Sequence, residues 1–399
     1  MSGWPEMTLR EAGVTLIDCD HRTPPPSASG FPYIAIPQLK HGRLDLSDVR
    51  YITREHFLDW TRKAKPRPYD VILSRRCNPG ETAAVPPGLE CALGQNLVLL
   101  RADGRRVFPP FLRWLVRSPC WWEQIGEFIN VGAVFDSLKC ADIPNFELPL
   151  PPIPQQKAIA AVLGTLDDKI ELNRRTNETL EAITQALFKS RFVDATKHGL
   201  PKGWREGTIG DVAENVRCGV QPCEIQVSTP YIGLEHMPRH CIALSEWTHA
   251  ENLESNKFQF RRGEILFGKL RPYFHKVGVA PLDGVCSTDI LVVRPKQAEW
   301  FGFVLGHASS VELVNHTDAA STGTKMPRTN WQDIARFGVA LPPKSLAVDF
   351  TQRIRPLIER IVSNIHESGT LAALRHALLP KLVSGEIASP HPTKRKQYP

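Results

Sequence analysis

An internal repeat constrains this chain more than any other feature. Shifting the 399-residue sequence against itself by 191 residues aligns its two halves without a gap. The shift superimposes Asp142–Ile143 on Asp333–Ile334, Pro151–Pro152 on Pro342–Pro343, Asn173 on Asn364, Thr179–Leu180 on Thr370–Leu371, and Ala186–Leu187 on Ala377–Leu378. Solenoid repeats are much shorter, at about 20–50 residues. We therefore predict two copies of one unit, each consisting of a domain followed by a long helix.

The end of each copy has the pattern of one long helix. Steps of four and three residues follow an apolar stripe with a polar centre, which is typical of a coiled-coil seam. The predicted seam consists of Ile159, Leu166, Ile170, Asn173, Leu180 and Leu187 in the first helix and Ile354, Leu357, Ile361, Asn364, Leu371 and Leu378 in the second. A helix of about 35 residues is about 50 Å long, which exceeds the width of a small domain. The alternative, in which each helix packs only on its own domain, remains open.

Antiparallel pairing of the two helices would bring their polar centres together. Asn173 and Asn364 would then meet near the crossing, where a buried polar pair lowers stability but fixes the register. Pro356 interrupts the second pattern. Because proline lacks a backbone N–H, we expect it to kink this helix or to mark its effective start.

The segments that precede the helices predict mixed α and β structure. Short strand-like runs are bounded by glycine- and proline-rich loops, as strands between turns should be. In the first copy the runs are Tyr33–Ile36, Tyr69–Leu73 and Asn96–Leu100, and in the second they are Tyr231–Leu234, Gly263–Phe267 and Ser287–Val293. An aromatic helical segment, Phe108–Phe128, carries three tryptophans that we expect in the core: Trp114, Trp121 and Trp122. The shared skeleton with different loops predicts one scaffold that presents two different recognition surfaces.

The composition limits which partners, metals and cellular compartments we expect for this protein. The formal charge of +7 permits an anionic partner without requiring one. The nine cysteines lack metal-site pairing, because the nearest spacing, Cys218 to Cys223, has no second pair at the expected distance. We therefore predict no bound metal. The odd cysteine count, with no signal peptide and no apolar run of about 18 residues, predicts a reduced, cytoplasmic protein.

The candidate binding residues are basic and polar side chains that follow strands or lie in a late loop of each domain. In the first copy they are Arg75, Arg76 and Lys139, and in the second they are Lys269, Arg271, Tyr273, Lys325 and Arg328. Arginine and lysine in loops can neutralise phosphates or bind base edges. Gly263–Lys269 has the spacing of a phosphate-binding loop, but Leu270 replaces the metal-binding hydroxyl and the segment reads as a strand. No catalytic constellation is recognisable, so we predict no catalytic residues.

The sequences of the two predicted helices resemble the conserved regions of a known protein family. Leu150–Lys157 (LPPIPQQK), Leu166–Arg174, Asn177–Ala182 and Gln185–Lys189 are similar to the first conserved region of the specificity (S) subunit of Type I restriction–modification systems. Leu341–Pro343 and Leu379–Ile387 (LPKLVSGEI) look like the second conserved region. The resemblance covers essentially the whole chain, and it is strong in the helices and weak in the domains.

The resemblance implies a DNA-targeting subunit that is not itself an enzyme. Each variable domain would recognise one half of a bipartite double-stranded DNA sequence, and the helix pair would set the spacing. The same pair would dock two methyltransferase (modification) subunits, with restriction motor–nuclease subunits completing the complex. S-adenosylmethionine, ATP and magnesium would be bound by these partners, and the chain itself would hold no cofactor.

The resulting prediction is an α+β fold with two target recognition domains separated by two long helices that form an antiparallel coiled coil. The domains are residues 1–150 and 200–342, the helices are residues 151–199 and 343–388, and a basic tail follows at residues 389–399. The alternative function is a structural adaptor that joins two protein-binding domains without any role in DNA binding. A third, an ATP-dependent enzyme built on Gly263–Lys269, would require nucleotide binding by the chain alone.

Overall fold

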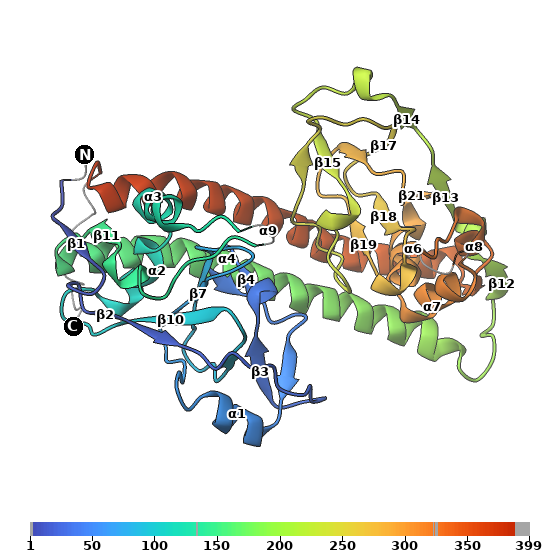
Figure 1. The fold of residues 1–399 in the computed structure, drawn as a ribbon. Coiled ribbons are helices and arrows are strands. Elements are labelled where there is room, and N and C mark those ends of the chain that lie inside the picture. Colours follow the sequence, from blue (N-terminus) through green and yellow to red (C-terminus); the bar gives the residue numbers. More distant parts are fainter. Residues whose placement is uncertain (1–2, 133–134, 322, 324–325, 388–399) are drawn as a thin grey trace, which may run out of the picture. The chain divides into compact units, whose positions relative to one another are not determined.

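The computed structural model describes residues 3–132, 135–321, 323 and 326–387. The chain divides into two compact units (Figure 1). Unit 1 comprises residues 1–167 and 373–399, and unit 2 comprises residues 168–372. The division therefore falls inside both long helices, whereas the sequence-based boundaries placed each helix in a segment of its own. The predicted basic tail, residues 389–399, lies outside the described residues.

The central sheet of unit 1 has four antiparallel strands in the order β2–β10–β7–β8. Its strands are β2 Val14–Asp18, β10 Leu97–Ala102, β7 Val71–Ser74 and β8 Thr82–Ala84. Smaller sheets join β1 Glu6–Thr8 with β11 Glu147–Pro149, β3 Phe31–Ile34 with β6 Arg50–Ile52 and β9 Ala92–Leu93, and β4 Leu39–Lys40 with β5 Arg43–Leu44. The three predicted strand-like runs of the first copy overlap β3, β7 and β10, although Ala35 and Ile36 lie beyond the end of β3.

Unit 2 has a central sheet with the corresponding order, β13–β21–β18–β19. Its strands are β13 Ala213–Val216, β21 Ile290–Pro295, β18 Ile265–Gly268 and β19 Val277–Val279. The other strands are β12 Arg205–Thr208 with β22 Gly338–Leu341, and a five-stranded sheet of β14 Gly219–Val220, β17 Lys257–Phe260, β20 Gly284–Cys286, β15 Pro230–Ile232 and β16 Thr248–His249. The predicted runs of the second copy overlap β15, β18 and β21, with boundaries that differ by up to three residues.

Short helices cover the sheets. They are α1 Arg54–Trp60, α2 Pro109–Leu115 and α3 Pro119–Phe128 in unit 1, and α5 Ile209–Val212, α6 Phe301–Ala308, α7 Val311–Ala319 and α8 Trp331–Ala335 in unit 2. The predicted aromatic segment is thus two helices, because Ser118 caps α3 and Pro119 occupies its first turn. Trp114 and Trp121 are buried as predicted. The prediction for Trp122 is wrong, since this residue is 43% exposed.

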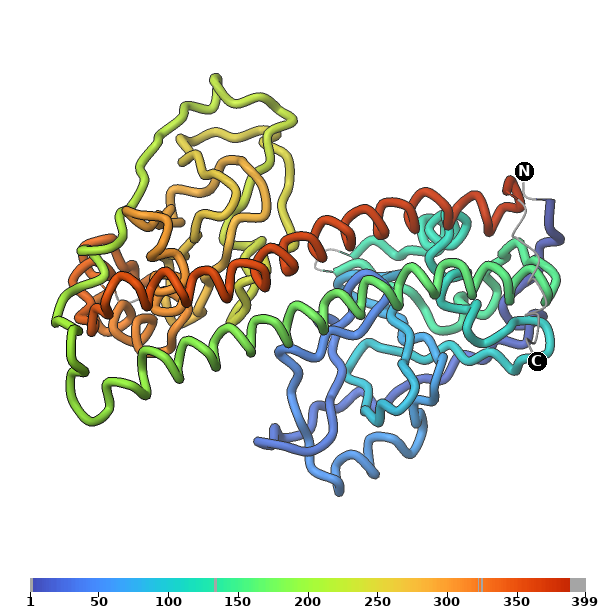
Figure 2. The backbone as a smooth tube through the Cα atoms, turned by 180° about the vertical axis from the view of Figure 1, so that it is seen from behind, coloured from blue at the N-terminus to red at the C-terminus, as the bar shows by residue number. Residues whose placement is uncertain are grey.

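The two long helices are α4 Ile153–Phe188 and α9 Lys344–Ser384. In both Figure 1 and Figure 2 they run side by side within each unit. A π-helical turn, Lys189–Val193, and a 3-10 turn, Asp194–Thr196, follow α4 before Gly199, whose φ is +113°. Among the described residues, no helix combines the length and the apolar character that a membrane crossing requires.

Helix α9 passes through Pro356 without ending. The expectation that this proline marks the start of the helix is therefore wrong. A proline inside a helix costs about 3 kcal/mol. Its neighbours Ile354 and Ile358 are buried in the core of unit 2, and burying such side chains stabilises by about 1.5–3 kcal/mol each. The packing of these isoleucines offsets the cost of the proline.

Both long helices contribute to the core of both units. Ile159 and Leu163 of α4 and Leu379, Leu382 and Val383 of α9 lie in the core of unit 1. In unit 2 the helix residues in the core are Phe188, Phe350, Ile354, Ile358, Ile361 and Ile365. Each unit thus builds its hydrophobic core from a domain and from one part of each long helix.

Candidate nucleic-acid interface

In unit 1, the loop that follows β7 is paired with a late loop of the domain. The backbone N–H of Arg75 donates to the carbonyl of Asn96 at 2.9 Å, and the N–H of Leu138 donates to the carbonyl of Arg75 at 2.9 Å. An antiparallel bridge joins Arg76 to Ser137. These bonds bring together the two segments that carry the predicted residues Arg75, Arg76 and Lys139.

Unit 2 builds the equivalent arrangement after β18. The N–H of Lys269 donates to the carbonyl of Asp289 at 2.8 Å, and the N–H of Thr329 donates to the carbonyl of Lys269 at 3.1 Å. An antiparallel bridge joins Leu270 to Arg328. The same backbone construction therefore holds a basic strand-end loop against a late loop in both units, although the side chains differ.

The side chain of Arg75 turns into the protein. Its Nη1 donates to the carbonyl of Leu138 at 3.3 Å, and its Nε is buried without a partner. Arg75 therefore holds the two loops together, and its side chain is less available than predicted. Arg76 and Lys139 are exposed at this site, which leaves them free to meet a ligand.

The cationic side chains of unit 2 gather around one carboxylate. Arg328 Nη2 lies 3.3 Å from Asp289 Oδ2. Burial lowers the pKa of Lys269, while Asp289 raises it and the nearby Arg328 and Arg217 lower it. Sequence reasoning missed Arg217, although it follows strand β13 in an exposed position. This cluster has more positive than negative groups, as a phosphate-facing surface requires.

A strained turn projects the next candidate residues. Arg271 and His275 have φ of +51° and +49° on either side of the 3-10 turn Pro272–Phe274, a conformation that is uncommon outside glycine and concentrates at functional sites. Tyr273 in this turn is 48% exposed. Arg239, which the sequence did not single out, lies over the ring of Phe274 at 4.1 Å. Lys325 lies outside the described residues.

The long helices bond each other through polar side chains in unit 2. Asn173 Nδ2 donates to Glu367 Oε2 at 2.8 Å and to Ser368 Oγ at 3.2 Å. Asn364 Nδ2 donates to Asn177 Oδ1 at 2.8 Å. These partners run in antiparallel order. The predicted pairing of Asn173 with Asn364 is wrong by one helical turn, because the facing positions are offset from the equivalent positions of the repeat.

None of the predicted seam residues is exposed. Ile159, Asn173, Ile354, Ile361 and Asn364 are buried, and Leu166, Ile170, Leu180, Leu187, Leu357, Leu371 and Leu378 are half-buried. After Asn177 the most buried positions of α4 are Glu181, Thr184 and Phe188. Glu181 and Phe188 lie one residue beyond Leu180 and Leu187 because an α-helix has 3.6 residues per turn while the strict seam assumes 3.5.

The chain is similar in sequence to proteins of known function. Residues 28–182 match the family described as the Type I restriction modification DNA specificity domain. The chain is 26% identical over 327 residues to the Type I restriction enzyme MjaIX specificity subunit of Methanocaldococcus jannaschii, a match that covers 74% of each protein. It is 20% identical to the Type I restriction enzyme EcoKI specificity subunit of Escherichia coli strain K12, over 90% of this chain and 82% of the relative.

The chain is similar to Type I restriction–modification specificity subunits over most of its length. The fold agrees. A solved S subunit of a Type I restriction–modification system from M. genitalium superimposes with a TM-score of 0.57 over 96% of both chains, at 14% identity. The matched relatives are specificity subunits rather than catalytic subunits.

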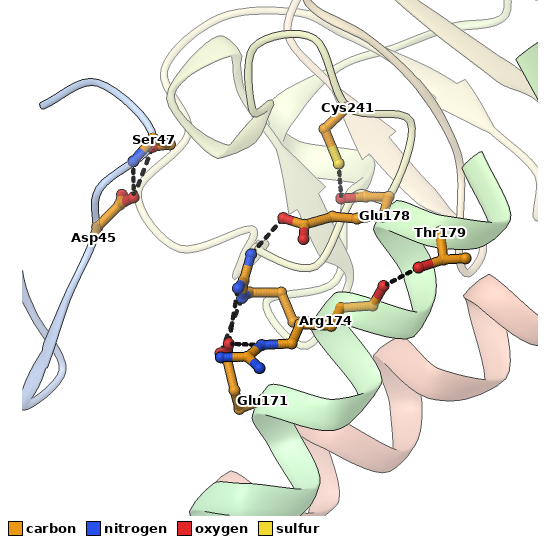
Figure 3. A network of polar contacts seen from close by, with 9 residues as sticks. Asp45, Ser47, Glu171, Arg174, Glu178, Thr179 and Cys241 are labelled. Atoms are coloured by element: carbon orange, nitrogen blue, oxygen red, sulfur yellow. Dashed lines mark hydrogen bonds and ion pairs between the residues drawn. The ribbon is translucent and has the colours of Figure 1, made fainter. Parts of the chain in front are cut away.

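Charged side chains form a network along one face of α4 (Figure 3). Arg174 Nη2 lies 2.8 Å from Glu171 Oε1, and Arg174 also contacts Glu178. Exposed pairs at this spacing contribute only about 0.3–0.5 kcal/mol each. Glu181 behaves differently, because it is buried and both of its oxygens accept from the N–H of Ile242, at 3.0 and 3.1 Å. It therefore ties α4 to the domain of unit 2, and burial raises its pKa.

One group among the described residues could offer three metal ligands. Ligand atoms of Asp18, Cys19 and His21 lie within 4.8 Å of one another. However, Cys19 Sγ donates to the carbonyl of Gly94 at 3.1 Å, and burial raises the pKa of this thiol to about 11. A metal ligand must be the thiolate, so these residues do not fit a metal site well. The Gly263–Lys269 segment includes strand β18, whose backbone bonds to β19 and β21 instead of cradling a phosphate.

Proposed function

We propose that this chain is the sequence-reading subunit of a Type I restriction–modification complex. Each unit would read one half of a bipartite double-stranded DNA target. The observation that carries this proposal is the shared backbone pairing of a basic strand-end loop with a late loop, around Arg76 in unit 1 and around Lys269 in unit 2. Equivalent scaffolds with different side chains suit two readers of different half-sites.

The residues proposed to contact DNA are exposed or partly exposed, and Arg75 is set aside because its side chain donates to the carbonyl of Leu138. Arg76 and Lys139 would act in unit 1, and Lys269, Arg271, Tyr273 and Arg328 in unit 2, with Lys325 retained as a candidate from the sequence. Arg217 and Arg239 join them because they are exposed and extend the same basic surface. Arginine can bind guanine edges bidentately, and lysine neutralises phosphates.

The two long helices would form an antiparallel coiled coil that sets the spacing between the readers. The hydrogen bonds from Asn173 to Glu367 and from Asn364 to Asn177 join the two helices and support this arrangement. The corresponding strand order of the two units supports a duplication. Two similar helix surfaces would dock two methyltransferase subunits, and motor–nuclease subunits would complete the complex. S-adenosylmethionine, ATP and magnesium would belong to these partners, and the complex would act in the cytoplasm.

Mapping of methylated bases tests this proposal directly. DNA from cells that carry the chain with its modification subunit should be methylated at one split sequence. The variants Arg76→Gln and Arg328→Gln should reduce or relax methylation at different halves of that sequence, while the control Arg105→Gln, which changes a side chain 88% exposed in unit 1, should leave it unchanged. Absence of any methylated sequence, with all subunits expressed, would count against DNA targeting and in favour of an adaptor.

A further inference from the structure

A buried arginine cluster in unit 1 plays no part in the DNA-facing loops described above. The carboxylate of Asp167, on α4, is fully buried. It contacts Arg113 of α2 and Arg375 of α9, and it lies 3.4 Å from Arg43 Nε of β5. One carboxylate therefore serves guanidinium groups from three other elements.

Arg117 adds a further cation to this cluster, and the carboxylates nearest to it, those of Asp167 and Glu81, act on it without an ion pair. Its Nη1 is buried and lacks a hydrogen-bond partner, and none of the described carboxylates lies within ion-pair distance of its side chain. A methyl group built on Gly42 would come within 2.5 Å of that Nη1, so the guanidinium lies against the backbone next to Arg43. Burial lowers the pKa of Arg117 to about 10; the nearby Arg375 and Arg113 lower it as well, whereas Asp167 and Glu81 raise it.

The fold does not need these charges. In unit 2 the shift of 191 residues leads from Asp167 to Ile358 and, in the other direction, from Arg375 to Thr184. Counted from the serines that cap the next helices, Ser118 and Ser310, Arg113 corresponds to Leu305 and Arg117 to Ser309. Ile358, Leu305 and Thr184 are all buried. The same place in unit 2 is thus packed with uncharged side chains.

A guanidinium with a buried, unpartnered nitrogen is costly, and a bound anion would supply the missing partner. Replacing a buried charged group by an apolar one often stabilises a protein, so a cluster kept in one unit and absent from the other calls for another explanation. Guanidinium groups present forked donors that match the oxygens of phosphate. We propose that Arg117, with Arg113, Arg375 and Arg43 held around Asp167, forms a binding site for a phosphate-type oxyanion.

Two sources could supply this oxyanion, a phosphate of the DNA backbone or free phosphate. The DNA source rests on the proposed function, whereas the site itself does not. Arg43 exposes 30% of its side chain and Arg117 is half-buried, so both guanidinium-bearing side chains are in part accessible to solvent.

Thermal unfolding of the full chain tests the site without DNA. Inorganic phosphate is compared with chloride at equal ionic strength, for the wild type, Arg117→Met and the exposed control Arg105→Met. Because phosphate also stabilises proteins generally, the signal is the difference between variants. When chloride is replaced by phosphate, the melting temperatures of the wild type and of Arg105→Met should rise by about 2–4 °C more than that of Arg117→Met. This is the rise expected for a weak ligand near saturation. Equal gains in all three proteins would overturn the proposal.

A second variant keeps the test decisive if Arg117→Met does not fold. Arg117→Lys retains the charge but loses the fork, so it should lose half or more of the extra gain in melting temperature. A full gain in this variant would refute the forked site.

The salt dependence of DNA binding then identifies the source. If the DNA backbone occupies the site, Arg117→Met should lower the slope of log K against log salt by about one. An unchanged slope, with the phosphate gain lost, assigns the site to free phosphate. If the wild type binds no DNA, the proposed function fails while the phosphate result still stands on its own.

Discussion

Asn364 on α9 donates a hydrogen bond through Nδ2 to Oδ1 of Asn177 on α4, at 2.8 Å. Both residues are buried, and Oδ1 of Asn364 is buried without a partner. This bond fixes the facing positions of the two helices in unit 2 at the level of Asn177 instead of Asn173. It also leaves one acceptor unsatisfied, which costs free energy.

Replacing both partners of this bond should be tolerated far better than replacing one. Asn364→Leu alone leaves the amide of Asn177 buried without its partner and should lower stability by about 1–3 kcal/mol. The double variant Asn177→Leu with Asn364→Leu should recover this loss or exceed the wild type, measured as the melting temperature. The pair Asn173→Leu with Asn364→Leu is the control and should show no recovery, because these residues bond different partners. Recovery in the control alone would restore the pairing predicted from the repeat.

Removing the proline from α9 should stabilise the chain. Pro356 is exposed, and its missing N–H leaves the carbonyl one turn earlier without its helical bond. Pro356→Ala should raise the free energy of unfolding by up to about 3 kcal/mol, measured by thermal unfolding. Glu359→Ala, also exposed on the same helix, is the matched control and should change little. An unchanged melting temperature for Pro356→Ala would mean that the helix already accommodates the ring without cost.

The buried Glu181 should make stability depend on pH. Burial raises its pKa above the value of 4.5 that it has in water. Between these two values the folded state binds more protons than the unfolded state, so stability falls as pH rises through that window. Glu181→Gln cannot ionise and keeps an acceptor for the N–H of Ile242. The melting temperature of this variant should therefore rise relative to that of the wild type as the pH rises above about 4.5. Parallel pH profiles for the two proteins would show that the carboxylate is not desolvated.

Arg75 and Arg76 are adjacent, yet they should give opposite results. Arg75→Gln removes the bond to the carbonyl of Leu138 and should lower stability by about 1–3 kcal/mol. Arg76→Gln changes an exposed side chain, so its melting temperature should match that of the wild type. Its DNA affinity should nevertheless fall, with a salt slope reduced by about one if it contacts a phosphate. The reverse pattern would mean that the two side chains have exchanged roles.

Local patterns in the sequence were sufficient to predict many of the helices and strands. The strand runs at Tyr69–Leu73 and Gly263–Phe267 were recognisable because apolar residues between turn residues favour a strand in almost any context. The long helices were recognisable from a spacing of three and four residues. The candidate loops could be located in the same way, because they follow the strands directly. Which of their side chains face outward could not, since Arg75 and Arg76 look alike in the sequence.

What the sequence alone determined was the repeat, the helix and strand elements and the resemblance to the specificity family, all of which depend on short-range order or on identity along the chain. The tertiary structure alone decided that Asn364 bonds Asn177, that Arg75 turns inward towards Leu138, and that Asp167 gathers Arg113 and Arg375. The physical reason is that a hydrogen bond or an ion pair forms or fails with differences of a few tenths of an ångström in the distance between residues far apart in the chain. Those distances are set by the packing of the whole unit, and a shift of one helical turn is enough to exchange one partner for another.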